Sequence, residues 1–131
     1  MIEEYYKQIT IEVKTYYLEQ ILYLRVDLNI NEIEIFYINN ENTKQRELYF
    51  LGNDDIEKLK NIMGKDVLGR LNNQIFENES SSEEPNKWTL SGSDNLSAEG
   101  SYFLPRELKK VLECIIRILG KNKFNSQINV L

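Results

Sequence analysis

Residues 21–51, ILYLRVDLNINEIEIFYINNENTKQRELYFL, decide the fold that the sequence predicts. Apolar and polar residues alternate here in three consecutive segments, which is the period of half-buried β-strands. The apolar parity holds Leu22, Leu24, Val26, Leu28, Ile33, Ile35 and Tyr37, and then Leu48 and Phe50. The links at 29–31 and 39–43 contain the Asn, Glu and Thr that suit hairpin connections. We therefore predict an antiparallel three-stranded meander.

The segment before the meander admits two interpretations. On a helical wheel of residues 2–20, apolar side chains gather within about a third of the circumference, which is typical of an amphipathic helix. These side chains are Ile2, Tyr5, Tyr6, Ile9, Val13, Tyr16 and Tyr17. The β-branched residues Ile9, Ile11 and Val13 instead alternate with polar ones and favour a strand. The helix accounts for more residues and is our prediction, with residues 9–14 left open.

Two helical segments are predicted after the meander. In the first, Ile56, Leu59, Ile62 and Met63 recur at helical spacing, with Asn53 or Asp54 as N-cap and Gly64 ending the helix. The second, within 65–76, carries Val67, Leu68, Leu71 and Ile75 at spacings of three and four. Gly69 and the Asn72-Asn73 pair weaken this second helix.

The rest of the chain predicts a loop, two short strands and a final helix. Residues 78–86 are polar and acidic and indicate a flexible loop, to about 87, inside the domain. Residues 87–90 and 101–104 predict strands, separated by the turn-rich segment 91–95. Pro105 suits the first position of a helix that ends near Gly120, and a short tail follows at 121–131.

The predicted fold class is therefore α+β. An antiparallel sheet, made of the three-strand meander and two further short strands, packs against N- and C-terminal helices that cover one of its faces. With 131 residues, the chain is expected to form one domain spanning 1–131.

Composition narrows the function classes. The chain has no histidine, the commonest general base and metal ligand, and so has no Ser-His or Cys-His nucleophile pair. The formal charge of -5 argues against direct nucleic-acid binding, which needs clustered Lys and Arg, and fits a basic protein partner better. We expect no cofactor.

Cysteine usage and hydropathy point to a reducing compartment. The single cysteine, Cys114, lies in an apolar run and cannot build a disulfide framework; it is a small core residue or, as an alternative, a reactive thiol. The N-terminus lacks the features of a signal peptide, and no apolar run approaches the roughly 20 residues of a membrane span. These observations predict a soluble, cytoplasmic protein without a membrane partner.

The acidity is concentrated in one segment. Residues 79–104 hold five carboxylates and one lysine, a net charge of -4, whereas residues 105–131 carry +4. The carboxylates are Glu79, Glu83, Glu84, Asp94 and Glu99. They form either a merely solvated loop or a surface that steers a basic partner, with Trp88 as an aromatic anchor or a core residue.

The polar parity of the meander is a second candidate surface. It mixes charged and aromatic side chains, and is too aromatic for a wholly solvated face. The residues concerned are Tyr23, Arg25, Asp27, Glu32, Glu34 and Phe36. Tyr49 and Tyr102 are further candidates for sheet faces or rims.

Catalytic patterns are not apparent. Asp54-Asp55 has a helix-cap explanation, and Glu83-Glu84 has no apolar neighbours that would raise a carboxyl pKa. Neither Gly92-Ser93 nor Gly69-Arg70 belongs to a phosphate-binding loop. The sequence therefore favours a non-enzymatic binding protein.

The predicted element order over residues 2–120, together with the acidity and the Asn-, Ile- and Lys-rich character, resembles small immunity proteins of bacterial contact-dependent inhibition and other polymorphic toxin systems. This resemblance implies neutralisation of a cognate toxin, expected to be a basic nuclease, by occlusion of its active site. The architecture also resembles type III secretion chaperones, which implies a homodimer that wraps an effector segment. Neither resemblance rests on a motif, and neither assigns a functional residue.

Overall fold

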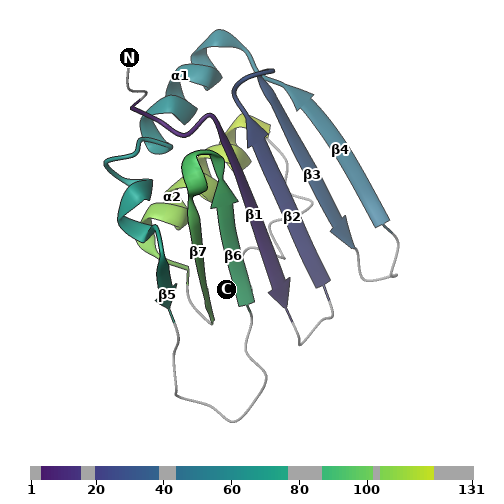
Figure 1. Cartoon of the computed structure of the whole chain (residues 1–131). Helices are drawn as coiled ribbons and strands as arrows, with labels where there is room; N and C mark the ends of the chain where they lie inside the picture. The colour runs from purple at the N-terminus through teal and green to yellow at the C-terminus, as the bar shows by residue number, and fades with distance from the viewer. Residues whose placement is uncertain (1–3, 16–19, 39–43, 77–86, 102–103, 120–131) are drawn as a thin grey trace.

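Seven strands form one sheet in the order β4-β3-β2-β1-β6-β7-β5, and two helices pack on one of its faces (Figure 1). The computed structural model describes residues 4–15, 20–38, 44–76, 87–101 and 104–119. The strands are β1 (Gln8–Thr15), β2 (Gln20–Asp27), β3 (Glu32–Ile38), β4 (Lys44–Phe50), β5 (Gln74–Phe76), β6 (Lys87–Gly92) and β7 (Ser97–Ser101). The helices are α1 (Asn53–Ile62) and α2 (Arg106–Leu119), with short 3-10 helices η1 (Leu68–Leu71) and η2 (Ser93–Asn95). The fold class is α+β, as predicted, and the sheet is antiparallel except for the parallel pair β5–β7.

The predicted meander is confirmed. Strands β2, β3 and β4 are consecutive antiparallel neighbours, and the register pairs Leu24 with Ile35 and Val26 with Ile33. The β2–β3 turn is fixed locally, because Asn29 N–H donates to Asp27 Oδ1 (2.9 Å) and Asn31 adopts a left-handed conformation (φ 54°) that Asn tolerates. The third strand begins earlier than its apolar residues indicated, at Lys44.

The predicted N-terminal helix is wrong over Gln8–Thr15, which forms β1 between β2 and β6. Ile9, Ile11 and Val13 are all buried on one side of this strand. In a helix, residues two apart point about 200° from each other, so these three β-branched side chains could not share a face. Their burial against the helices therefore decided in favour of the strand alternative.

Helix α1 lies where it was predicted, with a different cap. Gly52 is the N-cap and no side chain caps the helix, so Asn53 and Asp54 lie within its first turn. After Met63 the chain turns at Gly64, which pairs with Tyr5 as an isolated antiparallel bridge. A Cβ at Gly64 would lie 3.3 Å from the backbone oxygen of Asn61, a tight contact, and would displace the exposed Asp66 side chain.

The second predicted helix, within 65–76, is mostly wrong. Only the 3-10 helix η1 forms, with Leu68 and Leu71 buried, and β5 then joins the sheet edge beside β7. Asn73 has φ 63°, so the Asn72-Asn73 pair ends the helical segment and redirects the chain.

The next predictions hold in part. The strand predicted at 87–90 is confirmed and continues to Gly92. Of the strand predicted at 101–104, Ser101 ends β7 (Ser97–Ser101), Leu104 is not in a strand, and residues 102–103 lie outside the described residues. The inward-facing residues of β7 are Ala98 and Gly100, which are too small to give the sequence a visible alternation of large apolar residues. The intervening turn contains η2, where Asp94 and Asn95 adopt positive φ.

The core lies between one face of the sheet and the two helices. Helix α2, predicted from Pro105, buries Leu108, Val111, Leu112, Ile115 and Leu119 against the strands. Thus α1 and α2 cover the face that was assigned to N- and C-terminal helices. In the part of the chain that the structure describes, no helix is long and apolar enough to cross a membrane. The predicted loop at 78–86 and the tail at 121–131 lie outside the described residues.

Candidate functional site

The face of the sheet opposite the helices is uncovered by any described element. We call it the open face; on β2, β3 and β4 it comprises Tyr23, Arg25, Asp27, Glu32, Glu34, Phe36, Arg46, Leu48 and Phe50. Phe50, opposite Glu32 in the β3–β4 register, is 81% exposed, and Leu48, opposite Glu34, is 42% exposed. Ile75 of β5 lies opposite Glu99 of β7, also on the open face, and is 64% exposed. Leu48 and Phe50 are two positions apart on one strand and form one exposed apolar patch, which marks a candidate interaction surface, whereas Ile75 lies at the opposite edge of the sheet.

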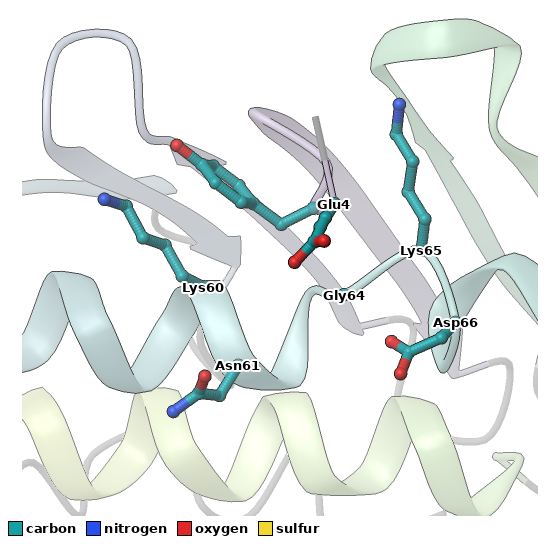
Figure 2. Close-up of a pocket in the computed structure, with 7 residues that line it drawn as sticks. Glu4, Lys60, Asn61, Gly64, Lys65 and Asp66 are labelled. Atoms are coloured by element: carbon teal, nitrogen blue, oxygen red, sulfur yellow. The ribbon is translucent and has the colours of Figure 1, made fainter. Parts of the chain in front are cut away.

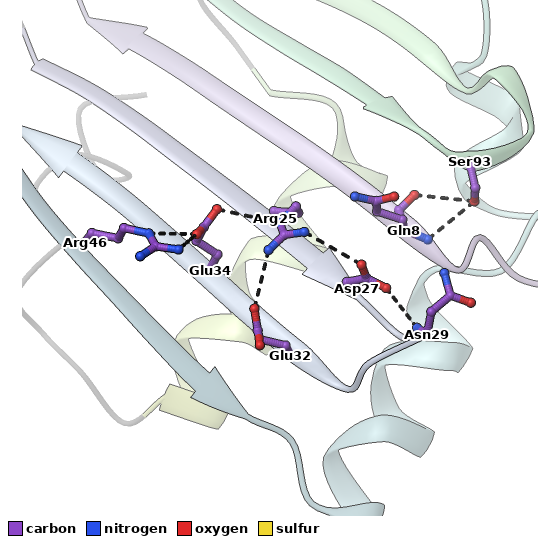
Figure 3. A network of polar contacts seen from close by, with 8 residues as sticks. All are labelled: Gln8, Arg25, Asp27, Asn29, Glu32, Glu34, Arg46 and Ser93. Atoms are coloured by element: carbon purple, nitrogen blue, oxygen red, sulfur yellow. Dashed lines mark hydrogen bonds and ion pairs between the residues drawn. The ribbon is translucent and has the colours of Figure 1, made fainter.

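Charged side chains on β2, β3 and β4 form one connected cluster on the open face (Figure 3). The Arg25 guanidinium lies 3.7 Å from Asp27, 3.4 Å from Glu32 and 3.6 Å from Glu34. Arg46 contacts Glu34 from the other side, through Nε at 2.8 Å and Nη2 at 2.5 Å. We call these five residues the arginine cluster.

Strand register explains the arginine cluster. Arg25 lies opposite Glu34 and Asp27 opposite Glu32, so one guanidinium reaches its own strand and both positions of its neighbour. The Arg25 side chain is only 24% exposed and its three carboxylate partners 13–15% exposed. Pairs this shielded from water lose less of their attraction to screening than exposed pairs do. Arg25 and its three carboxylate partners thus form a fixed polar pattern, whereas Arg46 is 59% exposed.

Aromatic side chains flank the arginine cluster. Phe36, on β3, is half-buried and lies opposite Tyr23 of β2 on one side and Arg46 of β4 on the other. Tyr23, also half-buried, lies opposite Glu12 of β1. The open face therefore brings together five predicted contact residues: Tyr23, Arg25, Asp27, Glu34 and Phe36.

The acidic residues predicted as contacts are not gathered in the same way. Asp94, in η2, is paired with Lys65 at 2.6 Å, so a neighbouring cation compensates its charge. Glu99 is exposed on the open face of β7, which β1 and β6 separate from the arginine cluster. Glu79, Glu83 and Glu84 lie outside the described residues.

Trp88 is a core residue and not a surface anchor. It lies on the helix-facing side of β6 and is 1% exposed, and its register partners are Val13 and Gly100. Of the two alternatives that the sequence left open for Trp88, the structure therefore favours the core residue.

A shallow hollow of about 630 Å³ lies between the N-terminal segment and the end of α1 (Figure 2). Its lining is Glu4, Tyr5, Lys60, Asn61, Gly64, Lys65 and Asp66. Each lysine is already engaged, since Lys60 lies 3.5 Å from Glu57 and 5.4 Å from the Tyr5 ring centroid, and Lys65 contacts Asp94. The two lysines and two carboxylates of the lining balance in charge, so this hollow is a weaker candidate than the open face.

The described residues give little support to a reactive thiol or a metal site. Burial raises the pKa of the half-buried Cys114 thiol, and Lys58 and Arg117 nearby oppose that rise. A raised pKa lowers the thiolate fraction, which weighs against the reactive-thiol interpretation. Among the described residues, no group of three or more His, Cys, Asp or Glu side chains could hold a metal ion.

Sequence reasoning missed the apolar part of the open face. Leu48 and Phe50 were assigned to the apolar parity of a core strand, but the β3–β4 register places them beside Glu34 and Glu32. A usable signal was that Tyr49 takes the other parity, so both faces of β4 carry large apolar residues. In comparisons with known proteins, the sequence matches no family model and no curated protein.

Proposed function

We propose that this chain is a non-enzymatic binding protein that holds a folded protein partner against the open face of its sheet. The observation that carries the proposal is the placement of Phe50 (81% exposed) and Leu48 on the uncovered face, beside the arginine cluster. Interface centres combine exposed aromatic or aliphatic anchors with arginine and few unpaired charges.

The arginine cluster supports specificity in this proposal. Its two arginines and three carboxylates hold one another, so a partner meets a fixed pattern of donors and acceptors without first ordering long side chains. The pattern has a net charge of only -1, so the open face itself supplies little long-range attraction. Long-range attraction must come from elsewhere in the chain.

The acidic segment 79–104 is the source of that attraction in our proposal. Its net charge of -4 would speed encounter with a basic partner, and the open face would then hold it. Attraction by the acidic segment and binding by the open face together fit an immunity protein that neutralises a cognate bacterial toxin, a basic nuclease, in the cytoplasm. By covering a phosphate-binding groove, the immunity protein would exclude the nucleic-acid substrate without binding nucleic acid itself.

The proposal predicts that a toxin domain is encoded beside this chain, and the experiment uses that domain. Purified protein should inhibit the toxin's activity stoichiometrically, and Phe36→Asn should raise the dissociation rate at least tenfold with little effect on association. Reversal of Glu79, Glu83 and Glu84 to Lys should mainly slow association, most strongly at low salt. Glu113→Lys, on the exposed side of α2, is the matched control and should leave both rates within about twofold.

Three outcomes would count against the proposal. Wild-type protein that leaves the toxin fully active would refute the immunity role. Unchanged dissociation in a folded Phe36→Asn variant would refute the open face as the contact surface. Equal association rates for wild type and the triple charge reversal would refute steering by the acidic segment.

A second candidate function is a secretion chaperone acting as a homodimer. It is favoured by the outer edge of β4, a seven-residue strand at the end of the sheet, since edges of this kind bind extended segments. A chaperone would bind an unfolded N-terminal peptide of its effector, whereas an immunity protein would bind a folded toxin domain. Titration of the same neighbour-encoded protein as a folded domain and as an N-terminal peptide separates the two functions.

A further inference from the structure

Strand β4 ends the sheet, and no described strand pairs with its outer side (Figure 1). Its sequence, KQRELYF, contains no proline, and its one lysine, Lys44, stands at the first position, outside residues 46–50. Arg46, whose charge would discourage association, has its guanidinium held on Glu34. The edge is therefore suited to pairing with another strand.

The backbone groups available at this edge can be identified from the β3–β4 register. Leu51 N–H donates to Asn31 O (2.9 Å), one position beyond the Glu32–Phe50 pair. In antiparallel sheets, hydrogen-bonded pairs alternate with pairs whose N–H and C=O point away from each other. The N–H and C=O groups of Phe50, Leu48 and Arg46 therefore point to the outer side of β4.

We infer that two copies of this chain pair antiparallel through β4, about a twofold axis at Leu48. In this register Leu48 lies opposite Leu48 of the second copy, and Arg46 lies opposite Phe50 of the second copy. All these residues present outward backbone groups, so the ladder closes with hydrogen-bonded pairs at each position. Their side chains share the open face, where two leucines meet and the apolar stem of Arg46 lies beside Phe50 of the second copy.

The same edge permits a second register, with the axis one position earlier at Glu47. That register would set Glu47 opposite Glu47 of the second copy and Leu48 opposite Arg46. Like charges directly opposite on adjacent strands are destabilising, and the Leu48–Leu48 contact is lost. The register centred on Leu48 instead places Glu47 beside Tyr49 of the second copy. This self-complementarity favours a second copy as the occupant over an unrelated strand.

A dimer paired through β4 would also enlarge the partner-binding surface, and this consequence rests on the proposed function. The twofold axis joins the two sheets edge to edge, so the two open faces become one continuous surface. One arginine cluster then lies on each side of the Leu48 and Phe50 side chains that meet near the twofold axis. A folded partner would contact residues from both copies.

The first test is the solution mass of the full chain. Analytical ultracentrifugation at micromolar concentration should give twice the 15.5 kDa chain mass. Leu48→Lys sets two lysines on the axis, and Leu48→Pro removes only an outward N–H; each variant should weaken dimerisation at least tenfold. Ile75→Lys, an exposed apolar residue on the opposite edge strand, is the matched control and should remain dimeric.

The second test reads the register by disulfide crosslinking in a Cys114→Ser background. Leu48→Cys should crosslink on oxidation, because opposed Cα atoms lie about 5.5 Å apart in a hydrogen-bonded pair. Glu47→Cys and Arg46→Cys should not crosslink, because each lies opposite a different residue number in the second copy. Preferential crosslinking at position 47 would overturn the proposed register.

The remaining outcomes are decisive for the dimer and separate from the proposed function. A wild-type monomer, or a dimer that persists in both Leu48 variants with circular dichroism unchanged, would overturn the β4 interface. A monomer that pairs through β4 only when the toxin is added would also overturn it, in favour of a foreign strand. Failure to bind the toxin would refute the proposed function while leaving the measured mass of the free protein unaffected.

Discussion

Replacement of Arg25 by Met should destabilise the fold markedly for a residue on the open face. The substitution keeps much of the apolar stem and removes the charge that Asp27, Glu32 and Glu34 share. Three carboxylates would then crowd one patch, with only Arg46 remaining on Glu34. Exposed ion pairs contribute about 0–1 kcal/mol, and breaking a fully buried pair costs about 3–5 kcal/mol.

The Arg25 side chain, at 24% exposure, lies between these limits, so we expect a loss of about 2 kcal/mol. Urea unfolding measures it, with fluorescence of the buried Trp88 reporting the global transition. Arg46→Met is the matched control, because this arginine is 59% exposed and its ion pair within the described residues is with Glu34; its expected cost is below about 1 kcal/mol. Equal losses in the two variants, or a loss below about 0.5 kcal/mol for Arg25→Met, would refute this account of the cluster.

Four further predictions concern packing, helix capping and reactivity. Gly92→Ala should lower the free energy of unfolding by about 1–3 kcal/mol, because the new Cβ would lie 2.5 Å from Gln8 O; thermal unfolding measures this loss. Gly52→Ser offers α1 a side-chain cap and should raise the melting temperature slightly. Trp88→Ala should cost about 3–5 kcal/mol by urea unfolding monitored with circular dichroism, and a small loss would contradict its core position. The pH profile of Cys114 alkylation by iodoacetamide should have its midpoint above the pKa of a free thiol in the folded protein, because burial disfavours the thiolate, and at the normal value in urea. A folded-state midpoint at or below the midpoint in urea would contradict this raised pKa.

The meander, α1 and α2 could be predicted because their patterns were long and periodic. Leu24, Val26, Ile33 and Ile35 repeat with the strand period over two adjacent segments, and one face of this sheet had to be buried. The N-terminal helix failed because tyrosines at 5, 6, 16 and 17 suited a helical wheel, although the short β-branched run decided the structure. The strand at residues 97–100 was not predicted because Ala98 and Gly100 carry too little apolar surface to signal burial.

The site was predictable only where it depended on nearest-neighbour strands. The polar parity of β2 and β3 indicated Arg25, Asp27 and Glu34 as one surface, and the register brings these side chains together. Leu48 and Phe50 depend on how β4 registers against β3 across a five-residue link, which local sequence does not encode. Whether Trp88 was a core residue or an anchor depended on its pairing with β1, which is remote in sequence.

Site-specific photocrosslinking to the neighbour-encoded toxin domain tests most directly whether the open face binds the partner. A benzophenone side chain is placed at Phe36 on the open face in one variant, and at Glu113 on the exposed side of α2 in another. We predict that illumination of the complex links the toxin through position 36 and not through position 113. Crosslinking at position 113 alone, with both variants folded and inhibitory, would contradict the assignment of the open face as the binding surface.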